Sequence, residues 1–569
     1  MEVLDDSTFT YQRVLDSELM TSATNQVSKL SFEFESQPPF AMTGYTVAAT
    51  ESGNPLTLIE GIFRIGRDTT GEVSGVTHNG TALLTAGYDL AGRRTSVASS
   101  FQGQVFSATI GYDGYGRKRT VTHANGLAGV IGYDALNRIQ TLDWTGAGEN
   151  MHESLQYSPA GKITSMTREF GTFSFGYDPL QQLTNVSYTG SETLPAAVNR
   201  TTSFDHAGNR KSDTVQGAGS FLKNAITEDA KATYFWGEDG LGQLAQRTDK
   251  VTGAMDTYEY WGDRQLRRYQ HFETSPIVSE TRSADYFYDP LGRRAAKRVT
   301  VGGSTFTQSY SHLGTEDRIL LAKNGVGEVS LYLDGQGIDE HLGHVTQAGA
   351  KAYVTDHLGS VLNTEVAGSA KVHGPWGELL GATPVITATS NPVEYGFTGR
   401  QWDAESWLYY YRARQYDPAT GRFLARDPIG LLGGDANLFR YVLNKPLVLV
   451  DPVGLTGWPT NDPEITSVFG RDRESGPHSG VDIRNPLGSP VFATESGTVG
   501  QVYSSDRGGN QIVINNINDS VSGYAHTFPV VSSGQSVTEG QIIGFSDASG
   551  KVDAHLHYTY RDSSDSAKS

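Results

Sequence analysis

Four histidines in the C-terminal stretch, residues 456–569, stand at spacings that can hold a metal ion. His478 and Asp482 are four residues apart, His526 follows later, and His555 and His557 flank a single leucine. A catalytic zinc site takes three protein ligands, from histidine nitrogens and carboxylate oxygens, and keeps one position for water. The chain has no cysteine, which excludes thiolate ligands. We therefore predict a Zn²⁺ site built from histidine and aspartate.

Strands and loops must position these groups. Gly480 makes a helix unfavourable between His478 and Asp482, so we expect a loop that leads into a strand. His555 and His557 are two residues apart, so on a strand both side chains share one face. One can bind the metal while the other stays beside it for proton transfer, and His526 would complete the set from a neighbouring strand. The simpler alternative is a strand with two surface histidines. The presence of all five candidate residues, four histidines and one aspartate, makes that alternative improbable.

Two aspartates suggest a second kind of chemistry. Asp427 and Asp451 each open a copy of the motif Asp-Pro-x-Gly-Leu. Two carboxylates that are brought together share one proton, so that one acts as base toward a water and the other as acid toward a carbonyl. The alternative is that both Asp-Pro pairs only form turns.

Composition limits the class of protein. The 569 residues include 66 glycines and 28 tyrosines, a balance that favours strands joined by tight turns. The formal charge of −18 without basic clusters argues against a nucleic-acid partner. The acidic N-terminus lacks the apolar core of a Sec signal peptide, and no apolar run is long enough to span a membrane. We expect either a dedicated export machinery or a fragment of a longer protein.

A repeat precedes the histidine-bearing tail. Its clearest copies are Gly87–Arg93, Gly111–Arg117, Gly132–Arg138 and Tyr288–Arg293, and weaker copies are Tyr157–Lys162, Gly176–Leu180 and Phe204–Arg210. In the general unit an aromatic ends a strand, Asp, Pro and Gly supply turn geometry, and Arg or Lys begins the next strand. A period of roughly 20–25 residues fits one β-hairpin per repeat, stacked on its neighbours. The alternative, an irregular β-sandwich, does not explain seven copies.

These Tyr-Asp…Gly-Arg units resemble the YD repeats of the Rhs family of polymorphic toxins and of the teneurins, over roughly residues 80–455. The stretch from Tyr353 to Leu455 resembles the Rhs repeat-associated core. The resemblance implies an all-β shell, a coiled sheet that forms a complete or partial cocoon. It also implies self-cleavage after Leu455 by Asp427 and Asp451, with Arg426 as an electrostatic helper.

The tail resembles the M23 (lysostaphin/LytM-like) metallopeptidases, whose pattern is HxxxD, YxH and HxH. The resemblance implies that His478, Asp482 and His557 bind Zn²⁺ and that His526 and His555 are the catalytic pair that does not bind it. Bound zinc would lower the pKa of its water toward ~7 and polarise the scissile carbonyl. The histidine pair would stabilise the oxyanion and move protons.

The sequence therefore predicts four parts: a β-rich segment 1–80, repeats 81–350, a core 351–455 and a small all-β peptidase domain 456–569. The predicted function is that of a secreted polymorphic toxin that cuts peptide bonds of bacterial peptidoglycan. A specialised secretion apparatus would deliver it to the target-cell periplasm, and a cognate immunity protein would protect the producer. The alternative is a non-enzymatic cell-surface protein whose inactive M23 module binds cell wall.

Overall fold

The structure is a computed structural model that describes most of the chain between residues 8 and 561. The residues outside the description are 1–7, 15–16, 25–27, 35–41, 50–57, 69–71, 192–197, 238–241, 263, 275–278, 315, 364–371, 381–385, 429–434, 456–463, 468–471, 474–475, 478–480, 485–489, 495–496, 506–508, 517–520, 530, 538–541, 547–554 and 562–569. The chain divides into two compact units. The shell unit comprises Met1–Arg426 and Phe439–Val450, and the tail unit comprises Asp427–Leu438 and Asp451–Ser569.

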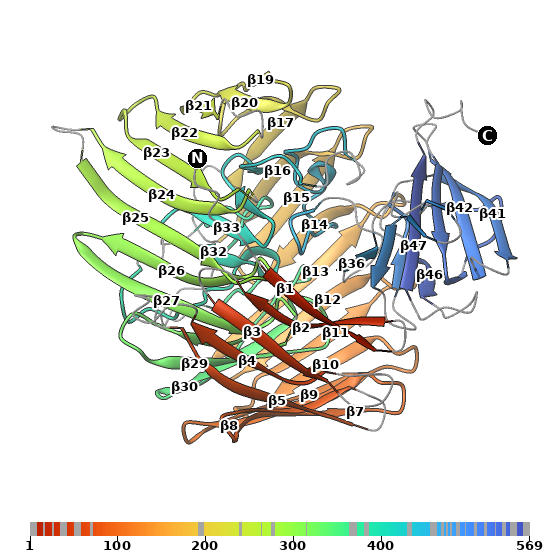
Figure 1. The fold of residues 1–569 in the computed structure, drawn as a ribbon. Coiled ribbons are helices and arrows are strands. Elements are labelled where there is room, and N and C mark those ends of the chain that lie inside the picture. Colours follow the sequence, from red (N-terminus) through yellow and green to blue (C-terminus); the bar gives the residue numbers. More distant parts are fainter. Residues whose placement is uncertain are drawn as a thin grey trace. The chain divides into compact units, whose positions relative to one another are not determined.

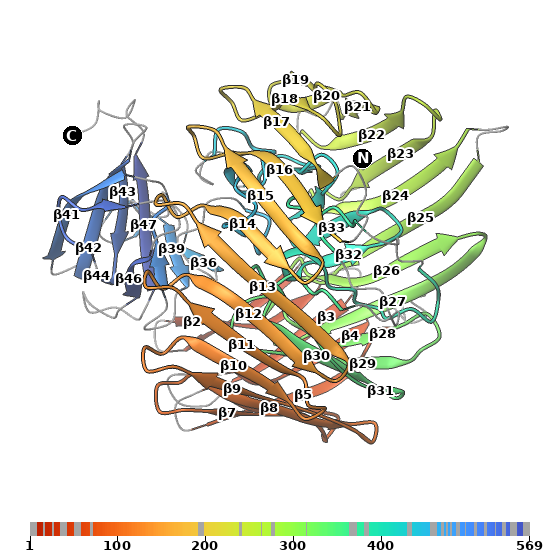
Figure 2. The same cartoon turned by 180° about the vertical axis from the view of Figure 1, so that it is seen from behind.

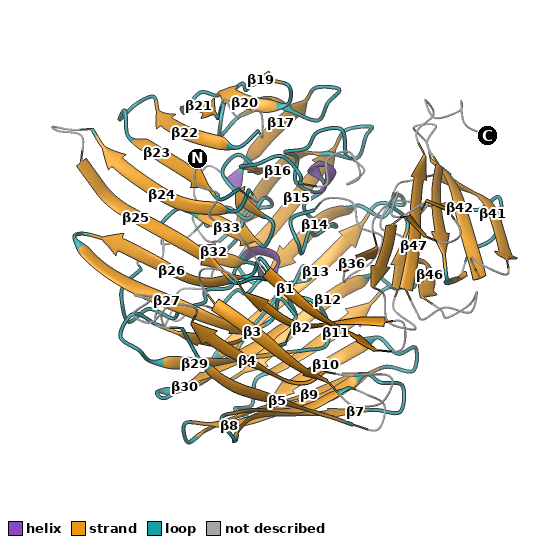
Figure 3. Cartoon of the chain, in the orientation of Figure 1, coloured by secondary structure: helices purple, strands orange, loops and turns teal. Residues whose placement is uncertain are grey.

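The predicted all-β class is confirmed. Among the described residues, strands and turns account for the secondary structure, apart from short 3₁₀ turns such as Phe397–Gly399 and Val442–Asn444 (Figure 3). Within that same part of the chain, no helix has the length and apolar character needed to cross a bilayer.

The shell unit begins with an eighteen-stranded antiparallel sheet in which each strand pairs with the next along the chain (Figure 1, Figure 2). Its strands are β1 (Thr8–Val14), β2 (Ser17–Thr24), β3 (Ser28–Phe34), β4 (Met42–Ala49), β5 (Gly61–Arg67), β6 (Val73–His78), β7 (Thr81–Tyr88), β8 (Arg94–Phe101), β9 (Gln104–Tyr112), β10 (Lys118–His123), β11 (Ala128–Tyr133), β12 (Ile139–Gly146), β13 (Glu149–Tyr157), β14 (Ile163–Arg168), β15 (Gly171–Tyr177), β16 (Leu183–Gly190), β17 (Arg200–Phe204) and β18 (Arg210–Asp213). The strands before residue 80 therefore pair directly into the repeat strands.

A second antiparallel meander of thirteen strands follows, and then a four-stranded sheet. The thirteen strands are β19 (Ser220–Leu222), β20 (Ala225–Glu228), β21 (Ala232–Trp236), β22 (Leu244–Asp249), β23 (Met255–Tyr260), β24 (Leu266–Glu273), β25 (Ser279–Tyr288), β26 (Arg294–Val301), β27 (Ser304–His312), β28 (Ile319–Lys323), β29 (Val329–Asp334), β30 (His341–Thr346) and β31 (Gly349–Ala352). The four are β32 (Gln401–Asp403), β33 (Leu408–Tyr411), β34 (Arg414–Asp417) and β35 (Arg422–Phe423).

Each repeat forms a turn that closes on itself. In the first clear copy, Asp89 Oδ1 accepts hydrogen bonds from the backbone amides of Ala91 and Arg93 at 2.9 and 3.0 Å. Asp89 Oδ2 accepts from Arg93 Nε at 2.8 Å. Gly92 has a φ of 71°, a backbone conformation that glycine adopts without steric cost. The repeated Asp, Gly and Arg are therefore the parts of one hydrogen-bonded turn.

Neighbouring repeats are joined through their tyrosines. Tyr112 OH donates to the Arg94 carbonyl of the preceding hairpin at 2.8 Å, and the Arg93 guanidinium lies 4.6 Å from the centre of the Tyr112 ring. The same cation–π step recurs from Arg117 to Tyr133 at 4.2 Å. Each unit thus contacts the next through its arginine and the previous one through its tyrosine, which explains why the motif repeats once per hairpin.

Buried ion pairs join the four-stranded sheet to the thirteen-stranded meander. Arg294 Nη1 lies 2.6 Å from Asp403 Oδ2, and Lys297 Nζ lies 3.0 Å from both Asp403 Oδ1 and Glu405 Oε1. Two positive and two negative groups balance one another, and removing one of them would leave a buried charge without compensation.

The described residues of the tail unit form sheets of seven, three and two strands. The seven-stranded sheet has the order β36 (Glu464–Ser467), β39 (Val481–Arg484), β47 (His555–Arg561), β43 (Val521–Ala525), β42 (Gly509–Asn516), β41 (Gly497–Ser505) and β45 (Ser536–Val537). The others are β40 (Pro490–Phe492), β46 (Ile542–Ser546) and β44 (Thr527–Pro529), and the pair β37 (Asp472–Arg473) and β38 (Gly476–Pro477). The core of this unit lies between the first two sheets and includes Ile483, Val491, Ile512, Ile543 and Leu556.

Candidate functional site

His555 and His557, predicted to share one face of a strand, lie on β47, an interior strand of the seven-stranded sheet. Leu556 is fully buried in the core, whereas His555 and His557 on either side of it are only half-buried. This alternation places the two histidines on the face of the sheet that points away from the core. The strand predicted at this motif is therefore present.

A strand beside β47 carries one further residue of the predicted set, Asp482. Asp482 on β39 is the Cα partner of His557, and on the other side Ala525 of β43 is the partner of His557 as well. Partner Cα atoms in an antiparallel ladder lie about 4.5–5.5 Å apart. An aspartate and a histidine therefore stand at paired positions of adjacent strands, and both residue types are ligands of zinc. His478 lies outside the described residues, and the structure describes Asp482 only through its backbone.

His526 stands at the corner where the chain leaves β43 for β44. Its φ is 57°, a left-handed conformation that costs free energy for a residue other than glycine. Its ring centre lies 4.4 Å from that of His555, and the residue is almost fully buried, with 5% of its surface exposed. The bend therefore turns the imidazole of His526 onto that of His555.

A hydroxyl cluster on the core side supports the strands that carry the histidines, and the sequence reasoning missed it. Thr494 Oγ1 lies 2.8 Å from Tyr524 OH, 3.0 Å from Tyr558 OH and 3.3 Å from Ser522 Oγ. The backbone amide of Thr494 also donates to Tyr524 OH at 2.8 Å. The cluster ties β43 to β47 beneath the site. The tyrosine of the YxH motif was its only sequence signal.

The aspartates of the two Asp-Pro motifs are both buried and both belong to the tail unit. Asp451 Oδ1 accepts a hydrogen bond from the Leu455 backbone amide at 2.8 Å, across a turn in which Gly454 has a φ of 72°. The backbone amide of Asp427 donates to the Leu438 carbonyl at 2.9 Å. The structure thus brings Asp451 to Leu455, and the residue that follows, Thr456, lies outside the described residues.

Arg426, the predicted electrostatic helper, belongs to the shell unit. Its backbone amide donates to the Gly242 carbonyl at 3.1 Å. A Cβ atom added at Gly242 would meet Arg426 Nε at 2.5 Å, so the arginine side chain packs against this glycine.

A group of carboxylates and histidine in the shell unit was not predicted. Ligand atoms of Glu153, Asp356 and His357 lie within 4.8 Å of one another. However, Arg168 Nη2 lies 2.6 Å from Glu153 Oε2 and 3.4 Å from Asp356 Oδ2. His357 donates from one side to Glu153 at 2.8 Å and contacts the Leu447 carbonyl at 3.1 Å. The carboxylates are therefore neutralised within the protein, and we interpret the group as a structural ion network.

Electrostatics agree with that interpretation. Burial alone would lower the pKa of His357, but the charge of Glu153 outweighs it, so the pKa of His357 lies above its usual value. Burial would raise the pKa of Glu153, and His357 and Arg168 hold it well below its usual range instead.

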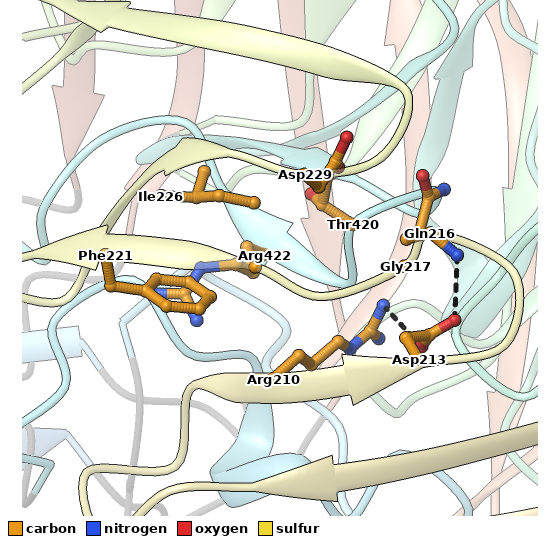
Figure 4. Close-up of a pocket in the computed structure, with 10 residues that line it drawn as sticks. Arg210, Asp213, Gln216, Gly217, Phe221, Ile226, Asp229, Thr420 and Arg422 are labelled. Atoms are coloured by element: carbon orange, nitrogen blue, oxygen red, sulfur yellow. Dashed lines mark hydrogen bonds and ion pairs between the residues drawn. The ribbon is translucent and has the colours of Figure 1, made fainter.

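The shell unit also has a pocket between β18, β19 and β20 (Figure 4). Arg210 reaches toward Asp213, with Nη1 3.8 Å from Oδ2, while the backbone amide of Gln216 donates to Asp213 Oδ1 at 2.9 Å. Burial, aided by the nearby Arg200, lowers the pKa of Arg210 to about 10. Phe221 and Ile226 form an apolar wall. None of the predicted site residues lines this pocket.

Residues 476–568 match the model of peptidase family M23. The chain is 26% identical over 444 residues to toxin subunit YenC1 of Yersinia entomophaga, which covers 65% of this chain and 44% of that protein. It is 28% identical over 374 residues to double-stranded DNA deaminase toxin A of Burkholderia cenocepacia, covering 57% of this chain and 24% of the relative.

The shell fold also occurs in a solved structure. The Photorhabdus luminescens Tc holotoxin pore has a TM-score of 0.58 at 18% identity, over 79% of this chain and 24% of that one. This chain spans less than half the length of each of these three proteins. It carries an M23 peptidase domain at its C-terminus, behind a shell of the kind found in Rhs and Tc toxin subunits.

Proposed function

We propose that this chain is a toxin whose tail unit is a zinc endopeptidase that hydrolyses peptide bonds of bacterial peptidoglycan. The observation that carries the proposal is the contact of His526 with His555, 4.4 Å between ring centres, beside the strand pair of Asp482 and His557. The match of this stretch to peptidase family M23 supports the same assignment.

His478, Asp482 and His557 would hold Zn²⁺. When bound, the ion would polarise the scissile carbonyl and activate a water. His526 and His555 would donate hydrogen bonds to the oxyanion that forms from that carbonyl and carry a proton to the leaving amine. The burial of His526 helps, because a hydrogen bond in a desolvated site is electrostatically stronger than in water.

The toxin role rests on the relatives, whose names describe toxins. Export by a specialised secretion apparatus, action in the target-cell periplasm and a cognate immunity protein follow from that role. We propose peptidoglycan as the substrate because its peptide bonds are the usual substrate of the peptidases that the tail resembles.

The test incubates the zinc-loaded full chain with purified peptidoglycan and measures new amino termini. We expect release by the wild type, loss with a chelator, and loss in His555→Ala. His152→Ala, an exposed histidine of the shell unit, is the matched control and should behave as the wild type. Binding to the cell wall without any release would favour the non-enzymatic alternative.

The second part of the proposal is self-cleavage between Leu455 and Thr456 by Asp427 and Asp451, with Arg426 as helper. The contact of Asp451 with the Leu455 amide at 2.8 Å supports it, since a buried carboxylate lies beside the residue on the acyl side of that bond. Asp451→Asn should leave the chain intact, as measured by mass spectrometry. A fragment ending at Leu455 in that variant would contradict the proposal.

A further inference from the structure

Three consecutive residues shortly before Asp451 have left-handed backbone conformations. Val442, Leu443 and Asn444 have φ values of 38°, 54° and 59°. Such a conformation is unfavourable for residues other than glycine, and most so for a β-branched residue such as valine. It persists only where the surroundings hold the chain in place.

Asn444 is the group that holds this turn. The residue is buried, and its Nδ2 donates to Gln182 Oε1 and to the Gly208 carbonyl, both at 2.8 Å. These acceptors belong to two of the repeated turns, which begin at Asp178 and Asp205. The repeat array thus binds a segment more than 230 positions further along the chain.

A second contact fixes the same segment. The Leu447 carbonyl contacts His357 Nε2 at 3.1 Å, within the ion network of the shell unit. The Lys445 amide also donates to the Val442 carbonyl at 2.9 Å, which closes the left-handed turn. From Leu447 only three residues remain before the chain enters Asp451.

The chain segment that leads to Asp427 is also hydrogen-bonded to the shell unit. Ala425 forms an antiparallel bridge with Gln243, and the Arg426 amide donates to the Gly242 carbonyl at 3.1 Å. Both chain segments that run into the aspartates of the Asp-Pro motifs are therefore bound to turns of the shell unit.

We propose that Asn444 is a positioning residue for self-cleavage. Its two hydrogen bonds to the repeated turns restrict the positions that the carboxylate of Asp451 can take. This inference rests on the self-cleavage proposed above. In that reaction water adds across the Leu455–Thr456 bond: its oxygen joins the Leu455 carbonyl carbon, and the nitrogen of Thr456 leaves with a proton. Asn444 exchanges no atoms. It removes conformational freedom from the chain that carries one carboxylate, and misplacement by about 1 Å costs up to ~10²-fold in rate.

The experiment follows cleavage of the full chain during cell-free synthesis, by intact mass against time. Asn444→Gly keeps the left-handed backbone accessible but removes both hydrogen bonds, and we expect cleavage to slow by about tenfold or more. Gln336→Ala is the matched control, because Gln336 Nε2 donates to the carbonyl of another repeat glycine, Gly92, at 3.0 Å. It should fold and cleave as the wild type.

The pH profile of cleavage distinguishes a positioning role of Asn444 from a general loss of stability. If Asn444 sets the approach of the carboxylates, the midpoints of the pH profile of cleavage should differ between Asn444→Gly and the wild type. If Asn444→Gly does not fold by circular dichroism, Asn444→Asp decides, because it tolerates the left-handed conformation but cannot donate to either acceptor.

The outcomes are distinguishable. Cleavage of a folded Asn444 variant at the wild-type rate and with the wild-type profile overturns the positioning role and leaves the self-cleavage proposal standing. Absence of cleavage in the wild type overturns both.

Discussion

Two groups of this protein that contain histidine, one in each unit, are built in opposite ways. In the shell unit, His357 lies between Glu153 and a backbone carbonyl, and Arg168 completes a network of opposite charges. In the tail unit, His526 faces His555, a like group, at 4.4 Å. Opposite charges favour the protonated form of His357. The comparison separates a group that stabilises a fold from one suited to bind a cation or move protons.

The largest expected effect comes from breaking the shell network. Glu153→Gln would leave Arg168 and His357 buried without their main counter-charge, and we expect a loss of about 3–5 kcal/mol in the free energy of unfolding. Urea unfolding of the full chain measures it. Glu169→Gln, an exposed glutamate beside the network strand, is the control. A loss below about 1 kcal/mol would show that the network is not structural.

Another buried histidine of the shell unit, His123, allows a test by pH. His123 is buried, with no hydrogen-bond partner on either ring nitrogen, and burial lowers its pKa from 6.5 to about 4. The unfolded chain therefore binds a proton below pH 6.5 that the folded chain takes up only near pH 4. By linkage, stability should fall by about 3 kcal/mol between these values.

His123→Phe should remove this part of the acid sensitivity. The measurement is the free energy of unfolding at pH 7 and at pH 4.5 for both proteins. An equal decrease in the two proteins would show that His123 does not contribute to it.

In the tail unit, two substitutions distinguish metal binding from catalysis. His557→Ala should weaken zinc binding by about a hundredfold or more. Removing only a residue that hydrogen-bonds to a metal ligand already costs up to about a hundredfold in affinity, and His557 is a proposed ligand itself. His555→Ala should keep the zinc and lose hydrolysis. Calorimetric zinc titration of the full chain measures the first effect. Equal zinc affinity in both variants would contradict the assigned roles.

The smallest effect is expected in a single repeat turn. Asp134→Asn removes the ion pair with Arg138, whose Nη2 lies 2.6 Å from Asp134 Oδ2, but keeps an oxygen that accepts the turn amides. We expect a loss of about 0.5–1 kcal/mol in the free energy of unfolding, typical of a partly exposed ion pair. A loss as large as that of Glu153→Gln would show that a single turn contributes as much to the free energy of unfolding as the buried ion network does.

Local chemistry was readable from the sequence. The Tyr-Asp…Gly-Arg motif predicted turns because its aspartate, glycine and arginine complete one hydrogen-bonded loop within five residues, as Asp89 to Arg93 do. The spacing of His555 and His557 predicted one face of a strand, since strand geometry alternates at every residue. The all-β class followed from the same two signals.

Only the tertiary structure decided which distant residues meet. It brought His357 to Glu153 across 204 positions, Asn444 to the turn of Gly208, and His526 onto His555 through a left-handed bend. Such contacts depend on the register of whole sheets and on how segments pack onto them, and no short stretch of sequence carries that information. The sequence by itself therefore determined the repeated turns and the strand that bears the histidines, while the tertiary structure determined which charges are neutralised and which groups come together as a candidate site.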